Sequence, residues 1–95
     1  MVSFIVRLRF APEDRADMAE TVRLLADASR QEQGCISYIP LTLEEDPDTL
    51  LIFEQYVDPS ALDAHRASAH FERHAIGGLY QRMKDRSVEN LRSIE

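Results

Sequence analysis

With 95 residues, the chain has room for one hydrophobic core, so we expect a single domain over residues 1–95. The acidic residues behind its net charge of −6 are spread along the chain, and the lack of a basic face argues against a nucleic-acid partner. The single cysteine, Cys35, excludes an internal disulfide, which leaves oligomerisation as the usual way to reinforce so small a core.

The first predicted element is a β-strand over residues 2–10. Its apolar side chains alternate with Ser3, Ile5, Arg7 and Arg9, and the period of two is typical of a strand with one buried face. The buried set is Val2, Phe4, Val6, Leu8 and Phe10. This segment is too short to cross a bilayer and has no signal-peptide pattern, so we expect no membrane association and a cytoplasmic location.

A helix is predicted next, beginning at Pro12 and ending near Gln31. Proline is well tolerated in the first turn of a helix, and an apolar stripe with a period of 3.6 residues follows it. The stripe consists of Met18, Val22, Leu25, Ala26 and Ser29. We expect Gly34 to end this region in the left-handed conformation that glycine adopts without strain.

Two further strands are predicted over residues 35–44 and 49–57, joined by a turn at residues 46–48. In the first of them, Pro40 removes a backbone donor, which indicates an edge strand or a bulge. Its alternation places Cys35 with Ile39, Leu41 and Leu43 on one face, and Ile36 with Tyr38 and Thr42 on the other. The later strand is apolar on both faces and needs cover on both.

The last third of the chain is predicted to hold two helical pieces and a final strand. Asp58 and Pro59 begin a helix that runs to about Arg66, and Ser68 caps a second helix that Gly77 and Gly78 should weaken or kink. The second helix is expected to bury Phe71, Ala75, Leu79 and Met83. Residues 88–94 are predicted to form the final strand.

The resulting order, β-α-β-β-α-β, predicts an α+β protein with a ferredoxin-like split βαβ fold. In that arrangement the helices cover one face of the sheet only. The other face would still carry many apolar side chains, more than a monomer usually exposes to water. We therefore expect a homodimer in which two sheets pack face to face.

Three stretches of the chain resemble the antibiotic biosynthesis monooxygenase family. Ala28-Ser29-Arg30-Gln31-Glu32-Gln33-Gly34-Cys35-Ile36-Ser37-Tyr38 resembles its helix-exit signature, and Leu51-Ile52-Phe53-Glu54-Gln55-Tyr56-Val57-Asp58 resembles its third strand. Ala61-Leu62-Asp63-Ala64-His65-Arg66-Ala67-Ser68-Ala69-His70-Phe71 is similar to its helix signature. The most similar subgroup is that of small single-domain quinol monooxygenases.

The resemblance implies a dimeric α+β barrel with a pocket between the sheet and the helices of each protomer. It also implies oxidation of a small quinol- or anthrone-like aromatic by molecular oxygen, without flavin, haem or metal. The sequence itself contains neither a dinucleotide-binding glycine fingerprint nor a His-Glu-x-x-His motif. We therefore expect no cofactor and no metal.

His65 and Glu54 are the candidate catalytic residues. Oxygenation without a cofactor needs a base in a shielded apolar pocket, and the imidazole of His65 titrates near neutral pH. Glu54 interrupts an apolar strand and should therefore be paired, with Arg7 or Arg9 as plausible partners. Two roles remain open for Glu54, which are orienting His65 or the substrate, and forming a structural ion pair at the dimer interface; the second is favoured.

The candidate substrate-binding residues are Tyr38, Tyr56, Phe71, His70 and Arg7. A tyrosine offers both an apolar ring and a hydroxyl that could hold a quinol oxygen, but ordinary packing explains these residues equally well. His70 and His74 are four residues apart on one helix, a spacing that can bind a metal. Because no third ligand accompanies them, they are interpreted as a solvated or capping pair.

Two other classes of function remain open. The same scaffold could hold a small hydrophobic ligand without turnover, as a binding or stress-related protein, because a fold does not dictate a function. A weaker alternative is an isomerase on a related dimeric barrel.

Overall fold

The computed structural model describes residues 1–95, and its elements follow the predicted order β-α-β-β-α-β. The protein is therefore an α+β protein of the ferredoxin-like class. The strands are β1 (Val2–Arg9), β2 (Cys35–Leu43), β3 (Asp46–Tyr56) and β4 (Asp85–Leu91). The helices are a 3₁₀ turn (Pro12–Asp14), α1 (Arg15–Ser29), α2 (Pro59–Arg66), a π-helical segment (Phe71–Leu79) and α3 (Tyr80–Arg82).

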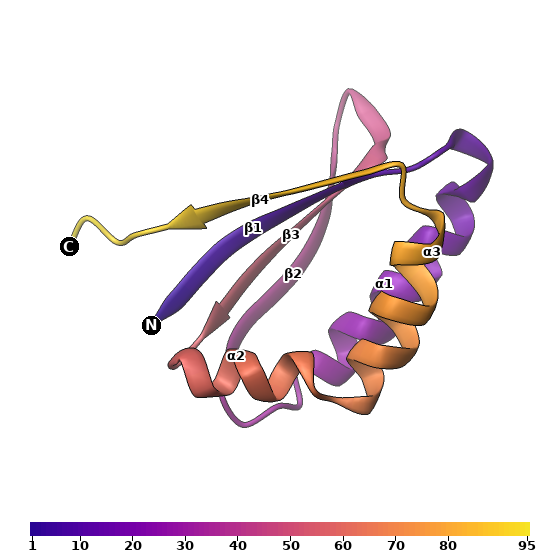
Figure 1. The fold of residues 1–95 in the computed structure, drawn as a ribbon. Helices are drawn as coiled ribbons and strands as arrows, with labels where there is room; N and C mark the ends of the chain where they lie inside the picture. The colour runs from indigo at the N-terminus through magenta and orange to yellow at the C-terminus, as the bar shows by residue number, and fades with distance from the viewer.

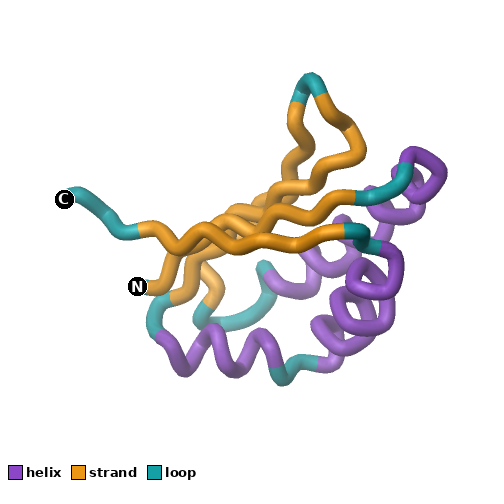
Figure 2. The backbone as a smooth tube through the Cα atoms, turned by 45° about the horizontal axis from the view of Figure 1, so that its top comes forward, coloured by secondary structure: helices purple, strands orange, loops and turns teal.

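The four strands form one antiparallel sheet in the order β2-β3-β1-β4. All helices lie on one face of this sheet, as both backbone views show (Figure 1, Figure 2). β2 and β4 are the edge strands, which confirms the edge position predicted from Pro40. Every residue of β4 is exposed, so the helix layer does not cover this edge.

The core lies between the helices and the sheet. The predicted alternation of β1 is confirmed, because Phe4, Val6, Leu8 and Phe10 are buried while Arg7 and Arg9 are exposed. The predicted stripe of α1 is confirmed residue by residue. The β3 side chains that face the helices are Leu50, Ile52, Glu54 and Tyr56. The α1 side chains that face the sheet are Met18, Val22, Leu25, Ala26 and Ser29.

The predicted faces of β2 are wrong at its beginning. The pairing register with β3 shifts between Cys35 and Ser37, and this irregularity adds one residue to the alternation. As a result Cys35 packs against the core on the same side as the buried Tyr38, whereas Ile36 is exposed. A bulge of this kind leaves no clear signal in the pattern of apolar residues.

Two predicted boundaries also differ from the structure. The turn between β2 and β3 lies at residues 44–45 rather than 46–48, and Pro47 is part of β3 beyond its last pairing with β1. There the missing N–H of Pro47 costs nothing, while the Asp46 carboxylate accepts from the Thr49 hydroxyl at 2.6 Å. The last strand spans Asp85–Leu91 rather than 88–94, because Leu91 pairs with Ser3 close to the beginning of β1.

Gly34 has no left-handed backbone, so the predicted reason for this glycine is wrong. Its role is a close approach between the chain before β2 and helix α2. A Cβ atom at this position would lie 2.4 Å from the Cβ of Ala61 and 3.3 Å from Cγ2 of Val57. Any side chain here would push α2 away from the end of the sheet, and α2 is the helix that carries His65.

The second helical region begins as predicted and then departs from α-helical geometry. The Ser68 hydroxyl accepts from the Phe71 backbone N–H at 3.1 Å and caps the helix. The chain is then π-helical from Phe71 to Leu79, a stretch that includes Gly77 and Gly78. None of the helices combines the length and the apolar character needed to cross a bilayer.

Candidate functional site

Helix α2 carries His65 to the centre of the core. The helix begins where the Asp58 carboxylate accepts from the Ala61 backbone N–H at 2.8 Å, followed by Pro59 in its first turn. One and a half turns later, His65 lies beneath the sheet with only 2% of its surface exposed. A titratable ring buried this completely needs hydrogen-bonding partners for its nitrogens, because an unpaired buried polar group is costly.

Three aromatic side chains pack against His65. Its ring centroid lies 5.2 Å from that of Tyr56, 5.2 Å from that of Phe71 and 5.7 Å from that of Tyr38. These rings form walls of low polarity around the imidazole. The structure therefore brings together four of the residues that the sequence singled out, from β2, β3, α2 and the π-helical segment.

Two carboxylates lie at opposite sides of the His65 ring. Nδ1 is 2.8 Å from Oε2 of Glu32, and Nε2 is 3.7 Å from Oε1 of Glu54. An ionised carboxylate accepts hydrogen bonds, so Glu32 favours the tautomer in which Nδ1 carries the proton and Nε2 has a free lone pair. Burial lowers the pKa of His65, and the hydrogen bond to Glu32 opposes that shift.

Glu54 is buried on the helix-facing side of β3, with 5% of its surface exposed. Its Oε1 accepts from the Tyr56 hydroxyl at 2.7 Å. Burial raises the pKa of Glu54 from its ordinary value near 4.5 to about 7, against the opposing effect of the Tyr56 hydrogen bond. A carboxyl group with that pKa can hold or release a proton near neutral pH.

The predicted pairing of Glu54 with Arg7 or Arg9 is wrong, and Glu54 faces the helices rather than the open face of the sheet. Glu54 is in register with Phe4, whose side chain faces the helices. Arg7 belongs to the opposite face, where its guanidinium lies 3.4 Å from the Glu89 carboxylate in an exposed pair. Arg7 therefore lies away from His65 and Glu54, because the odd-numbered residues of β1 face away from the helices.

The two tyrosines are protonated donors at neutral pH. Burial, followed by the nearby charge of Glu54, raises the pKa of both Tyr38 and Tyr56 above the ordinary tyrosine value. Tyr56 uses its proton in the bond to Glu54, which holds that carboxylate beside His65. The predicted contact of Tyr38 and Tyr56 with a substrate stays a prediction. The predicted roles of the other candidate residues also stay predictions.

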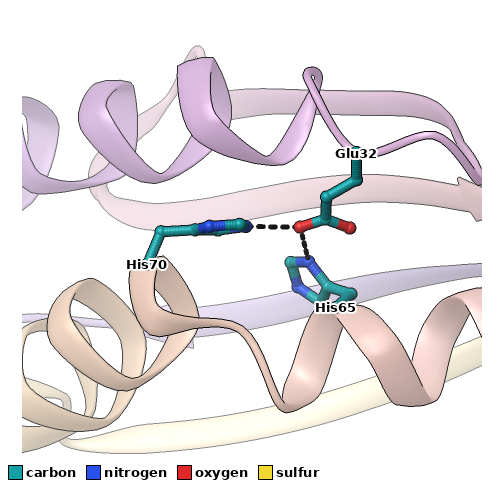
Figure 3. A group of neighbouring side chains, drawn as sticks. All are labelled: Glu32, His65 and His70. Atoms are coloured by element: carbon teal, nitrogen blue, oxygen red, sulfur yellow. Dashed lines mark hydrogen bonds and ion pairs between the residues drawn. The ribbon is translucent and has the colours of Figure 1, made fainter.

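His70 contacts Glu32, which lies 38 positions earlier in the chain. Nε2 of His70 forms a very close hydrogen bond with the same Glu32 oxygen that contacts His65 (Figure 3). Glu32 lies in the turn after α1, where its backbone N–H donates to the Ser29 carbonyl and its own carbonyl accepts from the Cys35 N–H. The interpretation of His70 as a solvated or capping residue is therefore wrong.

Sequence reasoning did not select Glu32, although it belongs to the first family-like stretch. Arg86 was also not selected. Its guanidinium carbon lies 5.5 Å from the ring centre of Tyr80, and both side chains line a small cavity beside His65 and Glu54. Exposed arginines and polar turn residues are common, so neither position stands out before the chain is folded.

The cavity beside His65 has a volume of about 30 Å³, and its wall includes Glu54, Phe71 and Tyr80. A second cavity of about 20 Å³ shares these three residues. Each has room for water but not for an aromatic ring. Because Phe71 and Tyr80 line both cavities, movement of these two side chains would change the space in both.

The chain matches the family model described as "Antibiotic biosynthesis monooxygenase" over residues 1–75. It is 40% identical over 80 residues to a Mycobacterium tuberculosis protein named "Putative monooxygenase Rv0793", covering 78% of this chain and 76% of that protein.

Solved structures agree with this match. A crystal structure described as an antibiotic biosynthesis monooxygenase superposes with a TM-score of 0.92 and 26% identity over the full length of both chains. The Rv0793 structure superposes with a TM-score of 0.88 and 25% identity, covering 99% of this chain and 95% of that chain.

Proposed function

This chain belongs to the antibiotic biosynthesis monooxygenase family, and from that premise we propose that it oxidises a small quinol- or anthrone-like aromatic with molecular oxygen. The proposal includes no flavin, haem or metal in the reaction. The observation that carries it is the position of His65, buried among aromatic rings with Nδ1 bound to Glu32 and Nε2 directed toward Glu54.

In the proposed reaction, the substrate itself supplies both electrons. His65 accepts a proton from a phenolic or enolic hydroxyl through Nε2, and the resulting anion is a much better electron donor to oxygen than the neutral substrate. One oxygen atom is added to a ring carbon of a quinol, or becomes the second ketone oxygen when the CH₂ carbon of an anthrone is oxidised to give an anthraquinone. The other oxygen atom leaves as water with two hydrogens from the substrate, so no external reductant is needed.

The residues around His65 have distinct roles in this scheme. Glu32 holds the ring in the tautomer with a basic Nε2 and stabilises the imidazolium that forms when the substrate is deprotonated. Glu54, with a pKa of about 7, is placed to exchange a proton with His65 or with a reduced oxygen species. Phe71 and Tyr80 must move to admit the aromatic ring, because the cavity between them is small.

The test is oxygen consumption by metal-free protein with a panel of small quinols and anthrones. We expect consumption above the rate of autoxidation in buffer for at least one member, with one oxygenated product formed per oxygen molecule used. Consumption equal to autoxidation for the whole panel would contradict the proposal. Tight binding of a panel member without turnover would favour a ligand-binding protein instead, and product without oxygen use would favour an isomerase.

We also propose that the protein is a homodimer packed through the open face of its sheet. Ile39, Phe53 and Ile5 lie side by side on that face in three adjacent strands, and Leu41 lies beside Leu51 in the next row. Ile39 and Leu41 are exposed in the single chain. A contiguous apolar area across three strands, rimmed by charged side chains, is typical of an interface between two sheets.

Replacing Phe53 with lysine at the centre of this face should convert the dimer to a monomer, because the charge would be buried without a partner. Light scattering at micromolar concentration measures the mass directly. Ile76→Lys is a matched control, because Ile76 is an exposed isoleucine on the helix layer. A wild-type mass equal to one chain, or an unchanged mass in Phe53→Lys, would contradict the dimer.

A further inference from the structure

Three side chains of types that commonly bind metals come from separate segments and lie close together. Glu32 comes from the turn after α1, His65 from α2 and His70 from the beginning of the next helix, and the two imidazoles point toward the same carboxylate (Figure 3). One ligand atom from each residue lies within 4.8 Å of the other two. The three segments are far apart in the sequence, so it is the fold that brings these donors together.

Two imidazoles and one carboxylate form a donor set that binds zinc and other divalent transition metals. Bonds of about 2.0–2.2 Å to a tetrahedral ion place neighbouring ligand atoms about 3.3–3.6 Å apart. Nδ1 of His65 and Oε2 of Glu32 are 2.8 Å apart. A small outward rotation of the Glu32 side chain would therefore make room for an ion between the three donors.

The surroundings also suit a bound cation. Glu32 is within 4.0 Å of no lysine or arginine, and its ion pairs are with the two histidines only. The side chains of Glu32 and His70 are 17% and 22% exposed, so solvent can reach the point where the donors meet and supply a water ligand. On the far side of His65, Glu54 lies 3.7 Å from Nε2, where metal-bound histidines commonly have a carboxylate partner.

We propose that Glu32, His65 and His70 bind one divalent transition-metal ion of the Zn²⁺ or Co²⁺ type, completed by water. This site goes beyond the proposed oxygenase reaction and competes with it for His65. A metal on Nδ1 leaves the proton on Nε2, where it points toward Glu54, so the ring can no longer accept a proton from substrate. Metal binding and general-base catalysis by His65 are therefore alternative states of one site.

The experiment is a titration of EDTA-treated protein, prepared without a polyhistidine tag, with Co²⁺ and Zn²⁺. We expect one ion per chain by calorimetry, and a Co²⁺ absorption spectrum of low-coordinate type that Zn²⁺ displaces. His70→Ala removes one ligand while keeping the contact between His65 and Glu32, and should weaken binding by about 100-fold or more. His74→Ala is the matched control, one helical turn away, and should bind as the wild type does.

Three outcomes would overturn the site. They are the absence of binding at millimolar metal, His70→Ala binding as tightly as the wild type, and His74→Ala losing binding to the same extent as His70→Ala. Binding is measured without substrate, so failure of the oxygenase proposal leaves this result unaffected. If the oxygenase proposal holds, Zn²⁺ at a concentration that saturates the wild type should also abolish its oxygen consumption, and removal of the ion with EDTA should restore it.

Discussion

Replacement of His65 with alanine is expected to lower oxygen consumption by about 100-fold or more, the usual contribution of a positioned general base. His65 is the only buried histidine. Its ring lies beside the carboxylates of Glu32 and Glu54 and lines the small cavity. Without it, a neutral phenol must lose its proton to Glu54 or to water. The measurement is the initial rate of oxygen consumption at saturating substrate, with binding of a non-reactive substrate analogue measured separately.

Loss of a buried side chain can also disturb the fold, so a second variant separates the two effects. His65→Gln retains a group of similar size that can donate to Glu32 but cannot accept a proton at neutral pH. It should fold, bind the analogue and lose the same activity as His65→Ala. His74→Ala should retain the wild-type rate, and a rate within twofold of wild type in His65→Gln would contradict the role of His65 as the base.

The sequence predicts the fold best where burial follows a regular period. In β1, Val6 and Leu8 alternate with exposed arginines, and the α1 stripe repeats every 3.6 residues, so both elements were predicted with the right faces. β4 is different, because all of its residues are exposed and its position is set by backbone pairing with β1. A strand of that kind has no apolar pattern, which explains its misplaced boundaries.

The residues of the candidate site were also predictable from the sequence only in part. Glu54 was identified because a carboxylate inside an apolar strand is conspicuous, and His65 because its imidazole titrates near neutral pH. The position of Arg7 could have been excluded by the alternation in β1, since Phe4 and Arg7 have opposite parity. Glu32 could not have been assigned from the sequence, because its contact with His65 joins residues 33 positions apart and depends on how the turn after α1 meets α2.

The raised pKa of Glu54 makes the stability of the protein depend on pH in a definite direction. In the unfolded chain this carboxyl group loses its proton near pH 4.5, whereas burial holds the proton in the folded state up to about pH 7. Between these values the folded state binds more protons, so the contribution of Glu54 to stability falls as pH rises. The lowered pKa of His65 acts in the opposite direction at acidic pH, so the wild-type curve combines both groups.

Glu54→Gln isolates the first of these effects and should stabilise the protein at pH 8 by roughly 3 kcal/mol, with little difference near pH 4. The glutamine amide imitates the protonated carboxyl group, and its oxygen can still accept from the Tyr56 hydroxyl. The measurement is urea unfolding of both proteins across this pH range at one fixed protein concentration, since assembly would shift the midpoint. Glu89→Gln, at an exposed carboxylate on the open face, should show no comparable pH-dependent gain. A contradicting outcome would be a difference in unfolding free energy between Glu54→Gln and wild type that is the same at pH 5 and pH 8. It would show that the Glu54 carboxyl does not titrate in the folded protein within that range, and would remove Glu54 from the proposed proton transfer.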